Sequence, residues 1–253
     1  MKGLDRMSNN LSGKVALITG GSRGIGLGIV NSLVNKGVNI AFTYEKSTNA
    51  AQSIVNHIEK AGKKALAIKA NNTKPEEIIH AVNQTVDKYG KLDILVNNAG
   101  IFPYGPYEDV TLEEFDNTLA IHVKAVFVAI QAATLHMKSG GRIINIGSCL
   151  AERVPEPGVA LYAMSKSALS GLTKGLARDL GSRNITVNTV NPGSTDTDMN
   201  PADGPGAKEE LKHIALGRYG LVEDIAAMVT HLAGDGGRNI TGTSIAVDGG
   251  FSA

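Results

Sequence analysis

The 253-residue sequence is poor in the residues that mark several classes of protein. It has no tryptophan, a single cysteine (Cys149) and a formal net charge of +1. One cysteine excludes an internal disulfide, and no His/Cys cluster has the spacing of a zinc site, so we expect no bound metal. Lysine and arginine are scattered and nearly balanced by acidic residues, so charge does not favour binding to nucleic acid or to a membrane surface.

Long apolar stretches are also missing. No run approaches the roughly 18 residues that a membrane-spanning helix needs. The opening MKGLDRMSNN lacks the apolar centre of a signal peptide. We therefore expect a cytoplasmic protein whose partner is a small-molecule substrate. Residues 1–12 are predicted to form a polar tail and residues 13–253 a single domain, which at this length buries enough surface to fold without a disulfide or a metal.

What the sequence does contain is a regular alternation of short apolar runs with longer helical patterns. The runs predict strands at 15–19, 38–43, 65–70, 92–97, 141–148, 185–190 and 244–247. The helical patterns fall at 24–36, 48–61, 75–89, 112–137, 160–181 and 222–234. Because the strand runs are continuously apolar, we expect a Rossmann-type α/β fold, a doubly wound parallel sheet of about seven strands with helices on both faces.

Two helical patterns begin with a capping box, in which a threonine is followed three residues later by a glutamate. These boxes are Thr73 with Glu76 and Thr111 with Glu114. Residues 193–216 form the longest weakly patterned segment late in the chain. Long connections of this kind often close over a site, so this segment is predicted to be a substrate lid.

The first strand leads into a glycine-rich turn, VALITGGSRGIGLGIV. Gly20, Gly24 and Gly26 have the spacing G-x-x-x-G-x-G, which differs by one residue from the G-x-G-x-x-G motif. Backbone without side chains can approach a pyrophosphate, and the helix that follows offers free N–H groups and the positive end of its dipole. The turn therefore predicts a dinucleotide site, the alternative being a glycine cluster that only allows a helix to pack closely.

The end of the second strand bears on which dinucleotide is bound. An enzyme specific for NAD usually has an acidic residue here, to hold the 2′-hydroxyl of the adenosine ribose. Thr43 and Tyr44 occupy this strand end instead, and Glu45 lies just past it. Arg23 in the glycine turn can pair with a 2′-phosphate. We therefore predict that NADP(H) is preferred, while Glu45 leaves NAD(H) as the alternative.

The stretch LYAMSK at 161–166 places Tyr162 and Lys166 one turn apart on the same helix face. Such a pair arises by chance in many helices. It gains meaning because ketone reduction builds negative charge on the carbonyl oxygen, which needs a proton donor within hydrogen-bond reach. A nearby ammonium lowers the tyrosine pKa from about 10. Ser148, at the end of the fifth strand, can donate a hydrogen bond to the same oxygen.

Six motifs in order along the chain together resemble the short-chain dehydrogenase/reductase family, in particular its 3-oxoacyl-ACP reductase-like and carbonyl reductase branch. They are TGGSRGIG (19–26), NNAG (97–100), Ser148, Tyr162-x-x-x-Lys166, NPGSTDT (191–197) and VDGGF (247–251). The resemblance covers the chain from about residue 12 to residue 253. It implies an oxidoreductase acting on a CH–OH group with NAD(P), with Ser148, Tyr162 and Lys166 as the catalytic group, and a homotetramer.

The resemblance also implies which residues hold the cofactor. The phosphates would be held by Gly20, Ser22, Arg23, Ile25 and Gly26, and the adenosine side would be lined by Tyr44, Asn71 and Asn72. The ribose side would be lined by Asn98, Ala99 and Gly100. The nicotinamide would lie against Pro192, Gly193, Thr195 and Thr197, together with Tyr162 and Lys166.

The sequence departs from the family at one position that bears on catalysis. His122 stands where the family usually has an asparagine, which bends its helix and holds a water that links the lysine to solvent. His122 therefore either keeps a proton relay alive, as a member of the catalytic group, or is a buried histidine with satisfied hydrogen bonds. A second departure is Asn71, where an aspartate is common, and an amide can still bond the adenine edge.

The residues predicted to face the substrate are Cys149, Leu150, Tyr104 and Met199. The chain shows no basic patch of the kind that an acidic acyl carrier protein would need. We therefore predict an NADP(H)-dependent reductase that acts on a small ketone or secondary alcohol, with Tyr162 as the proton donor. The alternatives are a 3-oxoacyl-ACP reductase of fatty-acid synthesis and a regulatory protein that binds the nucleotide without catalysis.

Overall fold

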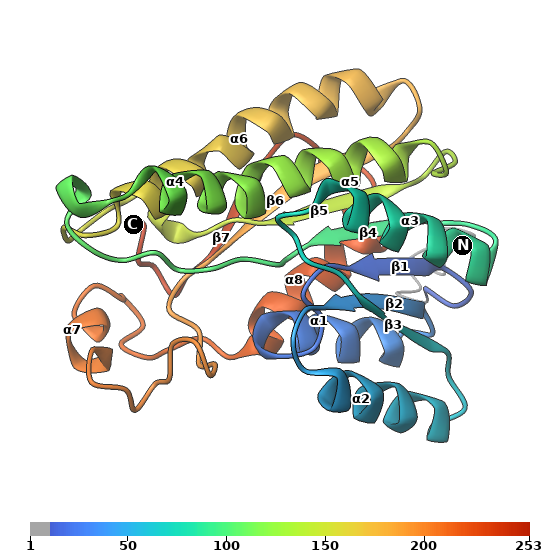
Figure 1. Ribbon diagram of the computed structural model, residues 1–253, viewed down its shortest axis with the longest axis horizontal. Helices are drawn as coiled ribbons and strands as arrows, with labels where there is room; N and C mark the ends of the chain where they lie inside the picture. The colour runs from blue at the N-terminus through green and yellow to red at the C-terminus, as the bar shows by residue number, and fades with distance from the viewer. Residues whose placement is uncertain (1–10) are drawn as a thin grey trace, which may run out of the picture.

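The computed structural model describes residues 11–253, and within them seven strands form one parallel sheet (Figure 1). The strand order across the sheet is β3-β2-β1-β4-β5-β6-β7. The strands are β1 (Val15–Ile18), β2 (Asn39–Tyr44), β3 (Ala65–Lys69), β4 (Ile94–Asn97), β5 (Arg142–Ile146), β6 (Thr186–Pro192) and β7 (Ser244–Val247). The predicted α/β fold is thus confirmed.

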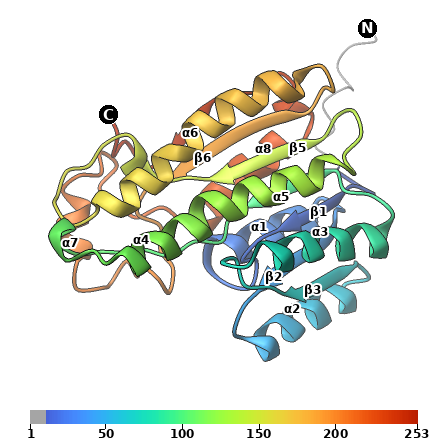
Figure 2. The ribbon, with the colours of Figure 1, turned by 45° about the horizontal axis from the view of Figure 1, so that its top comes forward.

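Helices cover both faces of this sheet, and Figure 2 shows α4 and α5, which follow one another end to end, running beside α6 over one of them. The helices are α1 (Gly24–Asn35), α2 (Thr48–Lys60), α3 (Pro75–Tyr89), α4 (Leu112–Leu119), α5 (Ala125–Thr134), α6 (Ala160–Gly181), α7 (Ala207–Leu211) and α8 (Val222–Ala233). Shorter turns are η1 (Tyr107–Asp109), the π-helical η2 (Ala120–Lys124), η3 (Cys149–Ala151) and η4 (Asp235–Gly237).

The continuously apolar strand sequences are explained by burial on both faces of the sheet. Ala16 and Ile18 point into a cluster formed with α1, α2 and α8. Val15 and Leu17, which alternate with them, point into a second cluster formed with α3, α5 and α6. Because successive side chains of a strand face opposite sides, a strand buried on both sides can be apolar at every position, as β1 is.

The order of the strands places the carboxyl ends of β1 and β4 next to each other at a topological switch point. From β1, the chain moves outward to β2 and β3, then returns to place β4 on the other side of β1. The crevice outside the strand ends at such a point is where open α/β sheets bind ligands. The glycine turn after β1 and the NNAG segment after β4 therefore meet at this edge.

Observed boundaries differ from the predicted ones by a few residues, with two exceptions of consequence. The pattern at 112–137 forms one continuous helical segment that ends at Thr134 and contains the π-helical turn η2. The predicted lid segment, 193–216, contains the helix α7, which periodicity missed because five residues are too few to show it.

At one of the two predicted capping boxes the threonine is confirmed as the N-cap, and at the other it is not. The Thr111 hydroxyl accepts a hydrogen bond from the Glu114 N–H at 3.1 Å at the start of α4. Thr73 does not cap α3, whose N-cap is Lys74. The Thr73 hydroxyl instead donates to the side-chain oxygen of Asn71 at 2.8 Å, so its position is set by the loop rather than by the helix.

The predicted polar tail at 1–12 lies mostly outside the described residues, of which Leu11 is the first. Leu11 is buried in the cluster beside α1 and α8, so the domain begins slightly earlier than expected. Among the described residues, the segment Leu112–Thr134 is long and apolar enough by composition to cross a membrane, with a mean hydropathy of 1.2. About half of it (44%) is buried inside the fold, and the core helix of a soluble protein passes the same test.

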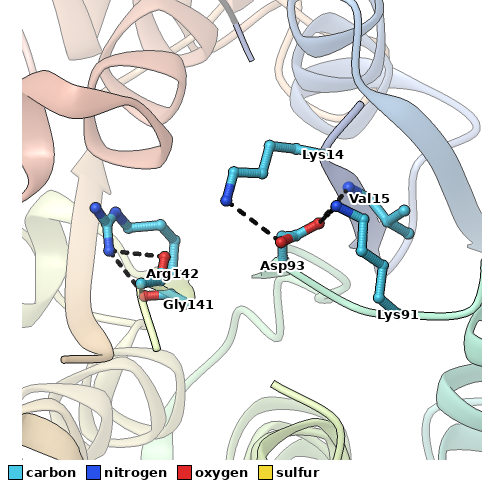
Figure 3. Close-up of polar contacts among 7 residues, drawn as sticks. Lys14, Val15, Lys91, Asp93, Gly141 and Arg142 are labelled. Carbon is cyan, nitrogen blue, oxygen red and sulfur yellow. Dashed lines mark hydrogen bonds and ion pairs between the residues drawn. The ribbon is translucent and has the colours of Figure 1, made fainter. Parts of the chain in front are cut away.

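The edge of the sheet opposite the crevice is held by one carboxylate, Asp93 (Figure 3). Its side chain accepts a hydrogen bond from the Val15 N–H at 2.9 Å and pairs with Lys91 at 2.8 Å and Lys14 at 3.3 Å. Its backbone carbonyl accepts from the Arg142 N–H at 2.9 Å. Asp93 thus joins the starts of β1, β4 and β5. Burial opposes its charge, but the hydrogen bonds from Lys91 and Val15 outweigh burial and lower the pKa of the carboxyl group.

We predict that Asp93→Asn lowers the free energy of unfolding by about 2 kcal/mol at pH 7, the usual size for a lost charge-assisted hydrogen bond. Because the folded-state pKa is lowered, the difference between the two proteins is fully present above the unfolded-state pKa of about 4 and is lost as pH falls through the folded value. Urea unfolding between pH 3 and 7 measures it. Asp87→Asn, at an exposed position on α3, is the control and should change stability by less than about 0.5 kcal/mol. A pH-independent difference between wild type and Asp93→Asn would show that the charge is not responsible.

Candidate active site

The glycine turn between β1 and α1 has a backbone that only glycine accommodates. Gly20 and Gly24 have φ values of +65° and +51°, in the left-handed region. A Cβ on Gly26 would lie 2.6 Å from the side-chain nitrogen of Asn98 and would overlap the carbonyl of Gly20. The turn is therefore pressed closely against the segment that follows β4, leaving its outer backbone open.

Hydrogen bonds from three strand ends brace this turn. The Gly20 N–H donates to the Thr43 hydroxyl at the end of β2, at 2.9 Å. The Asn98 and Ala99 N–H groups both donate to the Thr19 hydroxyl, at 2.9 and 3.1 Å. The side-chain nitrogen of Asn98 donates to the Gly20 carbonyl at 3.0 Å. Asn98, which we expected on the ribose side, thus holds the turn with its amide nitrogen.

The N-terminus of α1 is open to an anion. Its N-cap, Arg23, makes no side-chain capping bond, and the first turn of the helix has no acidic residue. An open groove of about 710 Å³ runs along α1 as far as Asn35, with α8 on its other side. At the N-terminal end of α1 this groove is lined by Arg23 and Gly24 together with Thr197 and Asp198. Free N–H groups and the positive end of the helix dipole favour a phosphate at this position.

Arg23 reaches across this groove to the predicted lid. Its Nη1 lies 2.5 Å from Oδ2 of Asp198, and both side chains are more than half exposed. A Cβ on Gly24 would lie 3.5 Å from the Thr197 side chain, so the segment after β6 closes directly over the turn. The guanidinium predicted to take a 2′-phosphate is therefore paired with a carboxylate in this structure.

On the adenosine side, Tyr44 and Asn72 are half-buried beside the ends of β2 and β3. The Asn71 side-chain oxygen accepts hydrogen bonds from both the N–H and the hydroxyl of Thr73. Its backbone N–H donates to the Glu77 carboxylate at 2.7 Å. The side-chain oxygen of Asn71 therefore shapes its own loop, so only the amide nitrogen would face an adenine.

The structure brings Ser148, Tyr162 and Lys166 together at the carboxyl edge of the sheet. Ser148 follows β5 and is buried, with its N–H donating to Asn191 Oδ1 at 3.2 Å. A side-chain hydrogen bond links Ser148 and Tyr162. Lys166 lies under the tyrosine, with Nζ 5.8 Å from the ring centre, and donates to the Ile146 carbonyl at 3.0 Å.

Buried polar side chains hold α6, which carries this tyrosine and lysine, against the sheet. Asn97 donates to Asn145 at 2.9 Å, and Asn145 donates to the Thr173 hydroxyl on α6 at 3.1 Å. The Thr173 hydroxyl is in turn 2.8 Å from that of Thr189 on β6. This chain of hydrogen bonds runs through β4, β5, α6 and β6, so it fixes the position of α6 relative to the carboxyl ends of these strands.

The electrostatics of the pair differ from the sequence expectation, which was that Lys166 lowers the pKa of Tyr162. Burial raises the tyrosine pKa to about 12, and the hydrogen bond with Ser148 only partly opposes it. Burial also lowers the pKa of Lys166 to about 8. The expected lowering is wrong for this structure because both groups lose hydration and the ammonium is directed at the Ile146 carbonyl. Near neutral pH the tyrosine keeps its proton and the lysine its charge.

His122 lies behind this group, in the π-helical turn η2, and is 1% exposed. Its Nε2 accepts a hydrogen bond from the Ile101 N–H at 3.0 Å, and its Nδ1 is 2.8 Å from the Ser165 hydroxyl. The ring centres of His122 and Tyr162 are 5.7 Å apart, edge to face. A Cβ on Gly100 would lie 3.2 Å from His122 Nε2 and 3.5 Å from Lys166 Nζ, so a side chain there would wedge between them.

On the predicted nicotinamide side, the segment after β6 also approaches another backbone closely. A Cβ on Gly193 would lie 2.7 Å from Cα of Asp248, so this position requires glycine. The hydroxyl of Thr195 is buried and donates to the Gly193 carbonyl at 2.9 Å. Thr197 accepts from the Asn200 N–H at 3.2 Å. Pro192, the last residue of β6, is buried beneath them.

The substrate side contains an aromatic wall of two residues, Tyr104, which the sequence predicted there, and Phe102, which sequence reasoning missed. The Phe102 ring packs edge to face on Tyr162, with ring centres 4.8 Å apart, and is stacked 6.3 Å from Tyr104. Phe102 is 46% exposed and Tyr104 is 69% exposed, as is half of Met199, so these side chains remain available to a ligand. The signal in the sequence was an aromatic residue two positions after the NNAG segment, followed by a second one.

Cys149, by contrast, does not line this opening. It is buried in a small cluster with Ile214, Tyr219 and Phe251, and Leu150 packs against the same cluster. Burial, and the negative charge of Asp248, raise the pKa of the Cys149 thiol to about 12, so it is not a nucleophile. Through these contacts Cys149 packs the loop after Ser148 against the predicted lid and the C-terminal segment.

Taken as a whole, the site fits a dinucleotide. Backbone cradles that a Cβ would fill occur at Gly20, Gly26 and Gly193, and an unfilled helix N-terminus lies between them. At the end of the crevice stands a group made of the buried Ser148 and Lys166 and the half-buried Tyr162. A nicotinamide bound with its phosphates on α1 would place its ring toward that group.

Comparison with known proteins agrees with this geometry. A family model described as enoyl-(acyl carrier protein) reductase matches residues 20–252. A cyclic-di-GMP-binding biofilm dispersal mediator protein of Escherichia coli K12 is 42% identical over 96% of this chain and 98% of its own. A hydroxynaphthalene reductase-like protein of Metarhizium acridum is 38% identical over 99% of both chains.

Solved structures are more similar still. A blue fluorescent protein from a metagenomic library, in complex with NADPH, has a TM-score of 0.95 and 56% identity, over 96% of this chain and 100% of its own. A short chain dehydrogenase from Burkholderia cenocepacia J2315, in complex with NADP, has a TM-score of 0.95 and 53% identity over the same shares. At this similarity the fold is shared.

Proposed function

Because this chain belongs to the short-chain dehydrogenase/reductase family, we propose that it is an NADP(H)-dependent reductase of a small ketone, or a dehydrogenase of the corresponding secondary alcohol. What supports this activity is the position of Ser148, Tyr162 and Lys166 at the end of a crevice whose other end fits a pyrophosphate. The bound cofactor would supply the hydride that is added to the carbonyl carbon.

The side chains of this group have distinct roles in the proposed reaction. The Tyr162 hydroxyl donates its proton to the carbonyl oxygen as charge develops there, and it holds that proton at neutral pH because burial raises its pKa to about 12. Ser148 donates a second hydrogen bond to the same oxygen and orients it. The Lys166 ammonium, which lies beneath the ring and donates to the Ile146 carbonyl, would hold the ribose hydroxyls of the cofactor.

The cofactor is inferred to be NADP(H) on two grounds. Similar structures are crystallised with NADPH or NADP. In this chain, Arg23 stands at the phosphate turn, and the end of β2 carries Thr43 and Tyr44 rather than an acidic side chain. A guanidinium in that place binds a 2′-phosphate by a fork of charge-assisted hydrogen bonds.

The substrate is proposed to be small and partly apolar, since Phe102 and Tyr104 stand beside the proton donor. The 3-oxoacyl-ACP alternative would need a basic surface at the opening for an acidic carrier. Arg153 is already engaged there, because its guanidinium donates to the Phe251 carbonyl and lies 5.5 Å over the Phe251 ring. Turnover of an acyl-carrier substrate well above that of free ketones would favour the alternative.

A regulatory role without catalysis is the second candidate, favoured by one relative named as a cyclic-di-GMP-binding mediator at 42% identity. The two candidates are separated by one pair of assays. Incubation with a panel of aliphatic and aryl ketones and NADPH tests catalysis, and calorimetric titration with cyclic-di-GMP tests binding. Turnover of any ketone that depends on Tyr162 supports the enzyme, whereas nucleotide binding without turnover supports the regulator.

We predict that Tyr162→Phe lowers kcat for ketone reduction by about 10²–10⁴-fold, the usual contribution of general acid–base catalysis. The dissociation constant for NADPH should change by less than about threefold, because the hydroxyl faces the substrate and the ring is retained. Steady-state kinetics and a nicotinamide fluorescence titration measure the two quantities, the latter free of tryptophan emission in a chain without tryptophan. Tyr107→Phe, which removes a hydroxyl from a residue 77% exposed, is the control and should keep wild-type kcat. Loss of NADPH binding with kcat preserved in Tyr162→Phe would contradict the assignment.

The lowered pKa of Lys166 predicts how the reaction rate depends on pH. Because burial lowers the pKa of Lys166 to about 8, its charge is present below that pH and is lost above it. We expect kcat/KM for NADPH, which reports groups of the free enzyme, to be level from about pH 6 to 8 and to fall about tenfold per unit above pH 8. Return to pH 7 should restore the rate, which excludes unfolding as the cause. A profile that stays level to pH 10 would show that the lysine charge is not needed.

Cofactor preference gives a prediction for the Arg23–Asp198 pair. Arg23→Gln should weaken NADPH binding about tenfold or more and leave NADH binding nearly unchanged, because only NADPH has the 2′-phosphate. Asp198→Asn frees the guanidinium and should strengthen NADPH binding by a few-fold, a small effect because the pair is exposed. Titrations with both cofactors measure these shifts. A wild-type kcat/KM for NADH equal to or above that for NADPH would overturn the preference.

A further inference from the structure

His122 is the buried histidine of this chain, and each of its two ring nitrogens has a hydrogen-bond partner. The other five histidines, at positions 57, 80, 136, 213 and 231, are all at least partly exposed. His122 lies in η2, where the π-helical turn widens the helix and turns this side chain toward α6. Its ring contacts two segments that are far apart in sequence, the one following β4 and the helix that carries Tyr162 and Lys166.

The proton on each ring nitrogen follows from the partners. Ile101 N–H is a donor, so Nε2 must be the nitrogen with the lone pair. The Ser165 hydroxyl has one proton, and it donates that proton to the Tyr162 carbonyl at 2.7 Å. Towards His122 the hydroxyl oxygen therefore accepts, and Nδ1 must carry the hydrogen. The ring is neutral with its proton on Nδ1, and both nitrogens are occupied.

A relay through an imidazole requires one nitrogen to take up a proton while the other releases one. Here the basic nitrogen, Nε2, faces a peptide N–H that cannot leave. The proton on Nδ1 leads to Ser165 and from there to the Tyr162 carbonyl, which is an acceptor without a further proton to pass on. The hydrogen-bonded chain thus ends within the protein on both sides.

From this geometry we infer that His122 is a positioning residue, which ties the segment after β4 to the catalytic helix as a neutral Nδ1–H imidazole, and that it does not carry protons to or from the Tyr162–Lys166 pair. The inference rests on the proposed function for its consequence in catalysis, but the protonation state is a property of the protein alone. Of the two alternatives that the sequence left open, the inference therefore favours a buried histidine with satisfied hydrogen bonds over a proton relay.

The surroundings favour the neutral ring. Burial and, next to it, the positive charge of Lys166 together lower the pKa of His122 to about 3. The titratable groups that face the ring from the packed elements are Lys166 and Tyr162, both on α6. Neither is an anion at neutral pH, so nothing among the described neighbours stabilises an imidazolium.

What the ring positions is the edge of the catalytic crevice. Ile101 follows Gly100, whose backbone passes beside both His122 Nε2 and Lys166 Nζ. Ser165 lies between Tyr162 and Lys166 on α6 and is 0% exposed. One imidazole therefore sets the distance between the NNAG segment, which borders the cofactor crevice, and the helix turn that carries the proton donor.

The protonation state can be tested directly on the whole protein by NMR with ¹⁵N-labelled histidine. We expect one of the six histidines to show the Nδ1–H tautomer with nitrogen shifts that do not change between pH 5 and 8, while the exposed histidines titrate. Absence of that signal in His122→Gln assigns it. If this variant does not fold, single substitutions of the five exposed histidines assign it by elimination. A His122 ring that titrates in this range, or carries its proton on Nε2, would overturn the inference.

Activity tests use two amides that each retain one of the two bonds. Glutamine can place an oxygen near Nε2 and accept from Ile101, and asparagine can place an N–H near Nδ1 and donate to Ser165. Phenylalanine keeps the ring but makes neither bond. For a positioning role we expect kcat to fall up to about tenfold in His122→Gln and His122→Asn, and more in His122→Phe. The pH dependence of kcat/KM should keep its wild-type limbs in both amide variants.

A relay through the imidazole predicts a different pattern, because glutamine and phenylalanine do not take up a proton at these pH values. His122→Gln and His122→Phe would then both lose about 10²–10⁴-fold in kcat, with a displaced pH profile, whereas His122→Asn, which restores the family's usual residue, would stay near the wild-type rate. That pattern would overturn the inference. A wild-type protein without ketone turnover would count against the proposed function instead, and the NMR measurement would still decide the state of His122.

Discussion

Burial of the parallel sheet on both faces is the constraint on which the rest of this structure depends. Strands β1 to β6 each contribute apolar side chains to two separate clusters, and polar side chains within the sheet, such as Asn145, are hydrogen-bonded in the interior. At the amino edge, Asp93 gathers the starts of three strands with its side chain and its backbone. At the carboxyl edge, the turns that follow the strands carry the chemistry. The division between a stabilising edge and a functional edge follows from the direction that all strands share.

Within the carboxyl edge, polar side chains that are removed from water must find partners in the protein. The glycine turn is held by Thr19, Thr43 and Asn98, which bond to backbone rather than to a ligand. Helix α6 is held by a buried chain of amides and hydroxyls that runs through Thr173 to Thr189. These partners leave few side chains free to move, so the crevice is rigid where the cofactor would bind and open where Phe102 and Tyr104 form its outer wall.

Desolvation has opposite consequences for the two ionisable groups of the proposed reaction. It keeps the proton on Tyr162 and weakens the hold of Lys166 on its own proton, which brings the two pKa values to about 12 and about 8. A tyrosine that keeps its proton suits reduction, in which it is the donor. For the reverse reaction it must lose that proton, which favours a higher pH. His122, buried next to them, stays neutral for the same physical reason, because burial and the lysine charge both disfavour an imidazolium.

The sequence by itself determined the fold class, the glycine turn and the juxtaposition of Tyr162 with Lys166, because each depends on local spacing that repeats with the period of a helix or a strand. The sequence did not predict the place of Phe102 beside Tyr162, because an exposed aromatic residue in a loop follows no periodic pattern. Only the tertiary structure decided the protonation of His122, the lowered pKa of Lys166 and the pairing of Arg23 with Asp198. Those properties depend on groups that are distant in the chain and on the exclusion of water, and neither is expressed in the spacing of residues along a sequence.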